Sequence, residues 1–151
     1  MPFAIAGFLS VLIFYLLSKK LFNKNVALVS TLLFSFSGFN VAFSRTVQYQ
    51  TFLILFGLCS IFLFVNKKYL LSAISLGFAF FSHYDAIFFA TPLLYFLLSD
   101  FADQKNKKLY IKNIVIYFLL PLFLIVGSFY VPYFYKGYFV QNTLTYLNKR
   151  V

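Results

Sequence analysis

Acidic residues are scarce in this sequence, and so are the residues that build most metal and redox sites. The 151 residues include 3 Asp and Glu, 1 His and 1 Cys. The single cysteine, Cys59, cannot form a disulfide within the chain, and one histidine with one cysteine makes no zinc cluster. A glycine-rich phosphate loop of the Walker or dinucleotide type is also absent. The residues therefore predict no metal site and no cofactor.

Apolar residues are abundant instead. Hydrophobic residues make up 62% of the chain, and the mean hydropathy is +0.87. A soluble domain of this length has too little interior to bury so much apolar surface, so long runs without charge predict transmembrane helices. A formal net charge of +10 could suggest a nucleic-acid partner. The basic residues lie in short clusters between apolar runs, which favours a membrane protein with no nucleic-acid partner.

Charged residues divide the chain into five apolar runs, which are 2–18, 26–44, 46–65, 69–99 and 112–135. At a helical rise of about 1.5 Å per residue, four of them reach roughly 25–36 Å, close to the roughly 30 Å of a hydrocarbon core. The run 69–99 has 31 residues and would reach roughly 46 Å as one helix, too long for simple tilting. We expect two half-helices instead, 69–82 and 86–99, that meet at His83–Asp85.

The predicted fold is therefore all-α, a polytopic transmembrane bundle of about five to six membrane segments, one of them a broken pair of half-helices. Residues 1–135 form the helical domain. Residues 136–151 form an extracytoplasmic tail or the start of a further segment.

The basic residues favour the broken pair. With the N-terminus outside, the split places nine of the 13 basic residues inside, against eight for one long helix. The N-terminus, residues 45–50 and residues 83–85 are then extracytoplasmic. This arrangement puts the unusual polar side chains on one outer rim, namely Arg45, Gln48, Gln50, His83, Tyr84 and Asp85.

Ionisable groups at membrane depth are functional candidates, and irregular backbone there lines a cavity or is covered by protein. Structural roles remain open beside the functional ones. Asp85 could cap the returning helix, and Arg45 could be a plain topology anchor. A small-residue spacing in which Ala73 is followed by Gly77, and Ser75 by Ala79, predicts close helix packing.

Four stretches carry a family resemblance: LLSKKLFNKNVALVSTLLFSFSGFNVAFSR, TVQYQTFLILFGLCSIFLFV, NKKYLLSAISLGFAFFSHYDAIFFATPLLYFLL and, faintly, QNTLTYLNKRV. The first is a helix, a basic turn and a helix ending in Ser-Arg. The third is a short helix, a basic-aromatic break and a second short helix. In this order the features resemble GT-C membrane glycosyltransferases of the protein O-mannosyltransferase and aminoarabinose-transferase group, over roughly residues 5–100.

The resemblance implies transfer of a sugar from a polyprenyl-phosphate donor to an acceptor at the extracytoplasmic face. In that group a basic residue at the helix break contacts the lipid phosphate, a place that His83 takes here. Arg45 would be the constant cation, and Gln48 and Tyr84 would line the same site.

The group also carries a catalytic Asp or Glu in an outer loop before the helix that resembles run 2–18. This sequence has no such loop, so we expect an incomplete enzyme whose partner is the missing part. The catalytic residue is unknown, and Asp85 is the candidate base within the chain. The alternative is a small transporter or flippase-like subunit with a solute or ion site at the broken helix. A passive membrane scaffold is a third interpretation.

Overall fold

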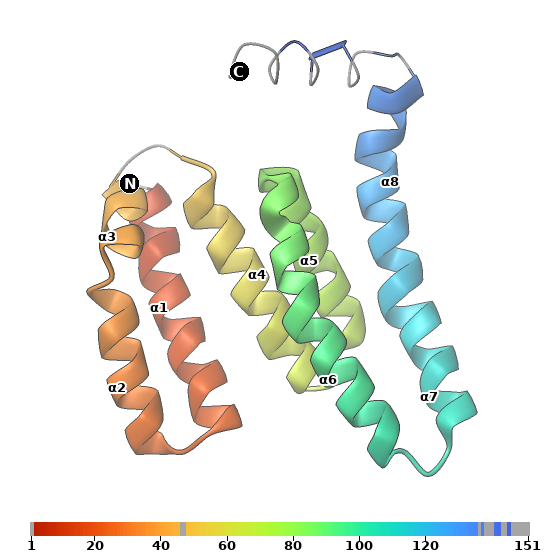
Figure 1. Ribbon diagram of the computed structural model, residues 1–151, viewed down its shortest axis with the longest axis horizontal. Helices are drawn as coiled ribbons and strands as arrows, with labels where there is room; N and C mark the ends of the chain where they lie inside the picture. The colour runs from red at the N-terminus through yellow and green to blue at the C-terminus, as the bar shows by residue number, and fades with distance from the viewer. Residues whose placement is uncertain (1, 46–47, 136, 138–140, 143–144, 146–151) are drawn as a thin grey trace.

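A computed structural model describes residues 2–45, 48–135, 137, 141–142 and 145 of the chain (Figure 1). Every regular element in these residues is helical, which confirms the predicted all-α fold. The elements are α1 (Pro2–Leu21), α2 (Lys24–Ser35), α3 (Gly38–Arg45), α4 (Gln50–Val65), α5 (Tyr69–Ser82), the 3-10 helix η1 (Tyr84–Phe89), α6 (Ala90–Asp103), α7 (Lys107–Ile114), the π-helical turn η2 (Val115–Leu119) and α8 (Leu120–Tyr135).

Several of these helices are long and apolar enough to cross a membrane. Within the described residues there are 3 such spans: Pro2–Leu21, Tyr84–Asp103 and Lys107–Pro132. Shorter apolar helices cover Lys24–Ser35, Gln50–Val65 and Tyr69–Ser82. Together these segments agree with the expected multi-span architecture. Helix α8 ends at Tyr135, and most of the tail 136–151 lies outside the described residues.

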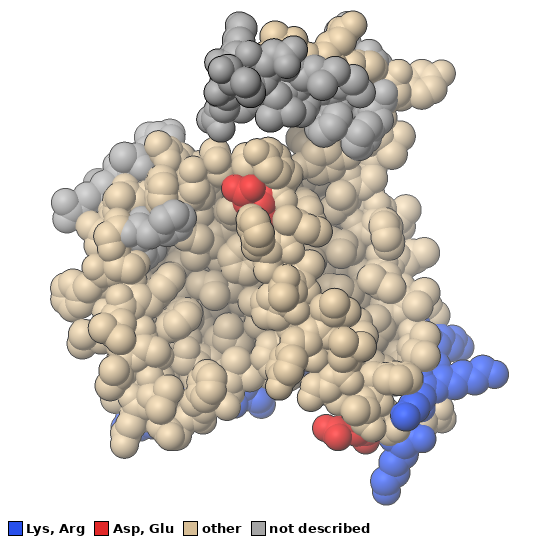
Figure 2. Space-filling view, in the orientation of Figure 1, with Lys and Arg blue, Asp and Glu red and all other residues tan. Residues whose placement is uncertain are grey.

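The chain runs alternately up and down, with α3 continuing in the direction of α2 and α8 in the direction of α7, so the connections between the other helices lie at two ends of the molecule (Figure 1). One end holds the α1–α2, α4–α5 and α6–α7 turns, and the lysines gather there (Figure 2). We call it the lysine end. The other end holds the N-terminus, residues 48–50 and the break at His83–Asp85, and we call it the hinge end. Residues 48–50 and 83–85 therefore lie at the same end of the molecule, where Tyr49 stacks on His83.

The predicted break is also confirmed, with a shifted second half. Helix α5 ends at Ser82, and His83 has extended backbone with φ −168° and ψ 152°. The second half-helix begins at Ala90 instead of Ala86 because η1 intervenes. η1 packs on α4 where Gly57 faces the ring of Phe89, and Ala86 is fully buried.

Run 26–44 was expected to be one segment, and this prediction was wrong. It forms α2 and α3, separated at Phe36 and Ser37. The Ser35 hydroxyl donates to the Leu32 carbonyl at 2.8 Å, and the Ser37 hydroxyl donates to the Phe34 carbonyl at 2.8 Å. Serine side chains that bond the backbone in this way compete with the helical ladder.

The last two runs are also longer than predicted. Helix α6 continues to Asp103 instead of ending at Ser99, so only the residues between Asp103 and Lys107 connect it to α7. The final helix starts at Lys107 instead of 112. Its π-helical turn, in which the Leu120 N–H donates to the Val115 carbonyl, precedes Pro121, which has no N–H to donate. The turn keeps the helix continuous through the proline.

Small residues hold α4 and α5 together, as their spacing predicts. The Ser60 hydroxyl donates to the Ser72 carbonyl at 3.0 Å, and the Ser72 hydroxyl donates to the Ser60 carbonyl at 2.8 Å. Ala73 and Ala79 are fully buried. This hairpin is the scaffold of the hinge end, because α4 begins there and α5 ends there.

Candidate functional site

His83 lies at the centre of the hinge end. Its backbone N–H donates to the Ala79 carbonyl at 3.1 Å and closes α5. Its carbonyl accepts from the Ala86 N–H at 3.1 Å and opens η1. The side chain is 20% exposed. The residue is thus fixed on both sides by the two helices that it separates.

Two tyrosine rings enclose the imidazole. The Tyr49 ring stacks on His83 with centroids 4.2 Å apart and an interplanar angle of 11°. The Tyr84 ring packs at 3.8 Å and 35°. Tyr49 precedes α4, so this stack joins the start of α4 to the end of α5. Tyr84 is 67% exposed and Tyr49 is 40% exposed, which leaves aromatic surface open beside the imidazole.

Asp85 contacts the same imidazole through two groups. Its Oδ2 lies 3.0 Å from His83 Nδ1, and its backbone N–H donates to Nδ1 at 3.2 Å. A charged imidazole donates from both nitrogens, so Nδ1–H then bonds the carboxylate. A neutral imidazole that accepts the Asp85 N–H at Nδ1 carries its hydrogen on Nε2. Nε2–H is a donor in these two arrangements, whereas the neutral tautomer that donates Nδ1–H to the carboxylate leaves Nε2 as an acceptor.

The segment before α4 lies close to this cluster. Gln48 is exposed, and the Oε1 atom of Gln50 is buried without a hydrogen-bond partner among the described residues. The Thr51 hydroxyl donates to the Phe43 carbonyl at 2.6 Å and ties α3 to α4. Arg45 is the last residue of α3, and its side chain lies outside the described part of the structure.

Helix α8 supports the cluster from the other side. The Tyr130 hydroxyl donates to the Phe80 carbonyl at 3.1 Å, three residues before His83. A side chain at Gly77 would lie 2.6 Å from Ile125 Cγ2, so α5 and α8 are in close contact. The hinge is therefore held by α4, α5 and α8 together.

The structure thus brings His83, Tyr84 and Asp85 together, and Gln48 directly precedes Tyr49, which stacks on His83. Sequence reasoning placed Gln50 at the same end but missed Tyr49. The triplet Gln48-Tyr49-Gln50 carried a signal, since it is a polar and aromatic interruption between apolar runs. The contact of Tyr49 with His83 spans 34 positions and needs the α4–α5 hairpin to form.

The remaining acids lie at the lysine end. Asp100 forms an ion pair with Lys67. Asp103 ends α6 and is exposed. Both are separated from His83 by the length of a helix. Among the described residues, Asp85 is the acid at the hinge end.

The hinge end combines hydrogen-bond donors, aromatic faces and one partly exposed carboxylate. Such a set can bind an anionic group together with a hydroxyl-bearing ligand. No group of three metal-binding side chains occurs in the described residues.

Comparison with known proteins assigns this architecture to a family. The family model described as dolichyl-phosphate-mannose-protein mannosyltransferase matches residues 1–129. Neither curated proteins nor solved structures gave a match.

Proposed function

The chain belongs to the dolichyl-phosphate-mannose-protein mannosyltransferase family, and we propose that its hinge end binds the phosphate of the lipid-linked sugar donor. Membership in this family identifies a membrane glycosyltransferase that uses a polyprenyl-phosphate sugar. The observation that carries the proposal is the cluster around His83, where Tyr49, Tyr84 and Asp85 meet at one end of the helical bundle.

Glycosyl transfer places specific demands on such a site. The acceptor hydroxyl oxygen bonds to the anomeric carbon, and the bond from that carbon to the phosphate oxygen breaks. A general base takes the hydroxyl proton, and polyprenyl phosphate leaves with the electron pair of the broken bond. Negative charge accumulates on the phosphate, where fixed donors and cations stabilise it most.

His83 and Arg45 meet this demand in the proposed site. Nε2–H of His83 donates to a phosphate oxygen, and the stack between Tyr49 and Tyr84 fixes the plane of the ring. Arg45 ends the helix that is tied to α4 through Thr51, and a guanidinium contributes a permanent charge with two parallel donors. Gln48 and Tyr84 provide further contacts to the donor.

Asp85 is a positioning residue in this proposal. Its carboxylate lies against Nδ1 of His83, where it orients the imidazole. A base in this position would be next to the leaving phosphate, where a second anion is unfavourable. Asp100 and Asp103 are at the lysine end. We therefore propose that the general base is supplied from outside these 151 residues.

The site faces the extracytoplasmic side in this proposal. Lysines concentrate at the opposite end of the bundle (Figure 2), and basic residues favour the cytoplasmic side of a membrane. A cysteine introduced at position 85 in a Cys59→Ala background tests the placement. An impermeant thiol reagent should label it from outside, and labelling from the cytoplasmic side alone would show that the orientation is reversed.

A broken helix is also typical of transporters, whose solute and ion sites use discontinuous helices. The two functions differ in their products. Transfer forms a glycoside, whereas transport moves a lipid or solute without making a bond.

The decisive assay supplies a radiolabelled polyprenyl-phosphate sugar and an acceptor to the chain, alone and together with an acidic outer-loop segment of the same family. We expect the chain alone to bind the lipid phosphate and to form glycoside only with that segment. Robust transfer by the chain alone, abolished by Asp85→Asn, would make Asp85 the base. Movement of the lipid across a vesicle membrane without glycoside formation in either sample would favour the transporter.

A further inference from the structure

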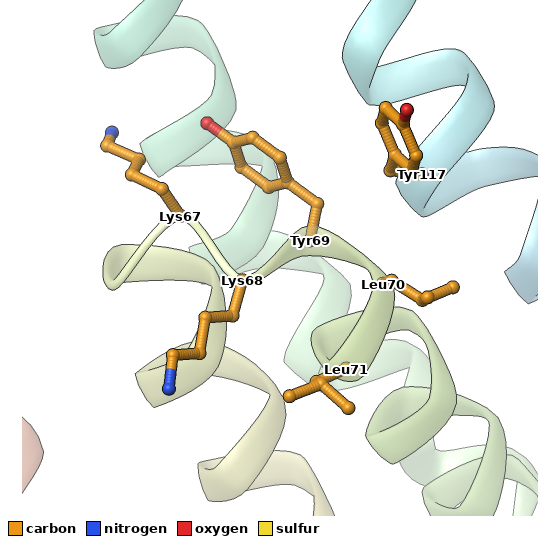
Figure 3. A pocket seen from close by; sticks show the side chains of 6 residues that line it. All are labelled: Lys67, Lys68, Tyr69, Leu70, Leu71 and Tyr117. Atoms are coloured by element: carbon orange, nitrogen blue, oxygen red, sulfur yellow. The ribbon is translucent and has the colours of Figure 1, made fainter.

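A cavity lies at the lysine end, near the start of α5, whereas the hinge is at the end of α5. A cavity of about 400 Å³ opens between the α4–α5 turn and the η2 turn. This volume lies within the range of small-ligand sites. Figure 3 shows the six lining residues, which are Lys67, Lys68, Tyr69, Leu70, Leu71 and Tyr117.

The two lysines of this cavity differ in their surroundings. Lys67 adopts a left-handed conformation with φ 62°, and its ammonium forms an ion pair with Asp100. Lys68 is exposed and has no acidic partner among the described residues. The lysine side chains leave the turn in opposite directions (Figure 3). The charge of Lys68 is therefore available to an external anion.

Hydrogen bonds of the turn hold this arrangement. The Lys67 N–H donates to the Phe64 carbonyl at 2.8 Å, and the Lys68 N–H donates to the Leu63 carbonyl at 2.9 Å. These two bonds form a Schellman motif, in which the left-handed position is usually glycine. The closed turn fixes Lys68 next to the first turn of α5, which contains no acidic residue.

The other walls of the cavity are apolar or aromatic and face outward. Leu70 is 46% exposed, Leu71 is 49% exposed and Tyr117 is 51% exposed. In a helix bundle of this composition, such surfaces contact acyl chains. Tyrosine side chains are enriched where the hydrocarbon meets the headgroups. The cavity therefore offers a cation beside an apolar surface at the end of the bundle.

We propose that this cavity binds an anionic phospholipid, with its phosphate on Lys68 and an acyl chain along Leu70, Leu71 and Tyr117. Basic pockets between transmembrane helices bind anionic headgroups, and such lipids are concentrated in the cytoplasmic leaflet. The site is distinct from the proposed donor site. Helix α5 has 14 residues, and it separates the cavity from His83 by about 21 Å.

The test uses the full chain in detergent micelles and counts retained lipids by native mass spectrometry. Phosphatidylglycerol is the anionic probe, and phosphatidylcholine with the same acyl chains is the neutral control. Lys68→Ala is compared with Lys20→Ala. Lys20 is the matched control because it is exposed in the last turn of α1, at the same end, and does not line the cavity.

We expect wild type to retain phosphatidylglycerol more tightly than phosphatidylcholine. Lys68→Ala should weaken retention about fivefold, as expected for the loss of one lysine near an anionic headgroup, while Lys20→Ala should have little effect. Equal losses in the two variants would indicate diffuse surface charge and overturn the proposal. Equal retention of both lipids would overturn the role of the phosphate.

Two further measurements test whether the cavity binds a phosphate from another source, either inorganic phosphate or polyprenyl phosphate. Inorganic phosphate should not displace the phospholipid at millimolar concentration, and displacement would indicate a site for soluble phosphate. Polyprenyl phosphate should keep its affinity in Lys68→Ala, because its proposed site is at the hinge end. A loss of polyprenyl-phosphate binding in this variant would mean that the cavity is the donor site.

Discussion

Gly57 in α4 offers a sharp test of how the hinge is positioned. A Cβ atom at this residue would lie 2.5 Å from ring atoms of Phe89, well inside van der Waals contact. Phe89 is the last residue of η1, which also carries Tyr84 and Asp85. Gly57→Ala should therefore displace η1 from α4 and move Tyr84 and Asp85. The substitution itself lies about 12 Å along α4 from Tyr49.

Two opposing terms set the magnitude for Gly57→Ala. Alanine favours a helix over glycine by about 0.5–1 kcal/mol. Overpacking a close contact costs about 1–3 kcal/mol. Gly127→Ala in α8 isolates the first term, because no heavy atom lies within 4 Å of a Cβ there. We expect the free energy of unfolding of Gly57→Ala to be lower than that of Gly127→Ala by about 1–3 kcal/mol. This difference is the cost of overpacking, because both variants gain the same helix propensity.

The assay is reversible unfolding in mixed micelles, followed by binding of polyprenyl phosphate to each variant. Gly57→Ala should lose binding, and Gly127→Ala should keep it. In a Phe89→Ala background the clash is removed, so Gly57→Ala should cause no further loss of stability. Equal stability of Gly57→Ala and Gly127→Ala in the wild-type background would refute the close packing of η1 on α4.

Three further predictions concern the site and its scaffold. Tyr49→Ala should weaken polyprenyl-phosphate binding and Tyr49→Phe should preserve it, since the stack on His83 needs a ring and no hydroxyl; equal losses would show that stacking is irrelevant. His83→Ala should weaken binding and His83→Gln should retain part of it, because a side-chain amide N–H can still donate to the phosphate; equal losses would contradict a donor role. Ser72→Ala should destabilise the chain by about 0.6–1.7 kcal/mol, the usual range for interhelical hydrogen bonds in membranes. A Ser60→Ala background should keep most of this effect, because the Ser72 hydroxyl donates to the Ser60 backbone carbonyl, which the substitution leaves in place; loss of the effect in that background would contradict this bond.

The break at His83 could be predicted because local sequence determines it. A run of apolar residues too long for one span contains a histidine and an aspartate, and both favour a helix end. The lysine clusters likewise predicted which turns share one end. These features depend on neighbours in the sequence and on the thickness of a bilayer.

Other features depend on contacts between distant residues. The start of α6 at Ala90 follows from the packing of Phe89 on Gly57, and no local pattern reveals that pair. The same is true of the Tyr49–His83 stack and of the Lys67–Asp100 ion pair. The split of run 26–44 was locally encoded in its serines, but hydropathy alone did not distinguish it from a continuous helix.

Photo-crosslinking with a polyprenyl phosphate that carries a reactive group next to its phosphate tests the central claim most directly. The full chain is labelled in membranes, and the crosslinked residues are mapped by mass spectrometry. The account predicts crosslinks at residues 48–50 and 83–85, competed by unlabelled polyprenyl phosphate. Competed crosslinks confined to the turn at Lys67 and Lys68 would contradict it, because they would place the donor phosphate at the lysine end.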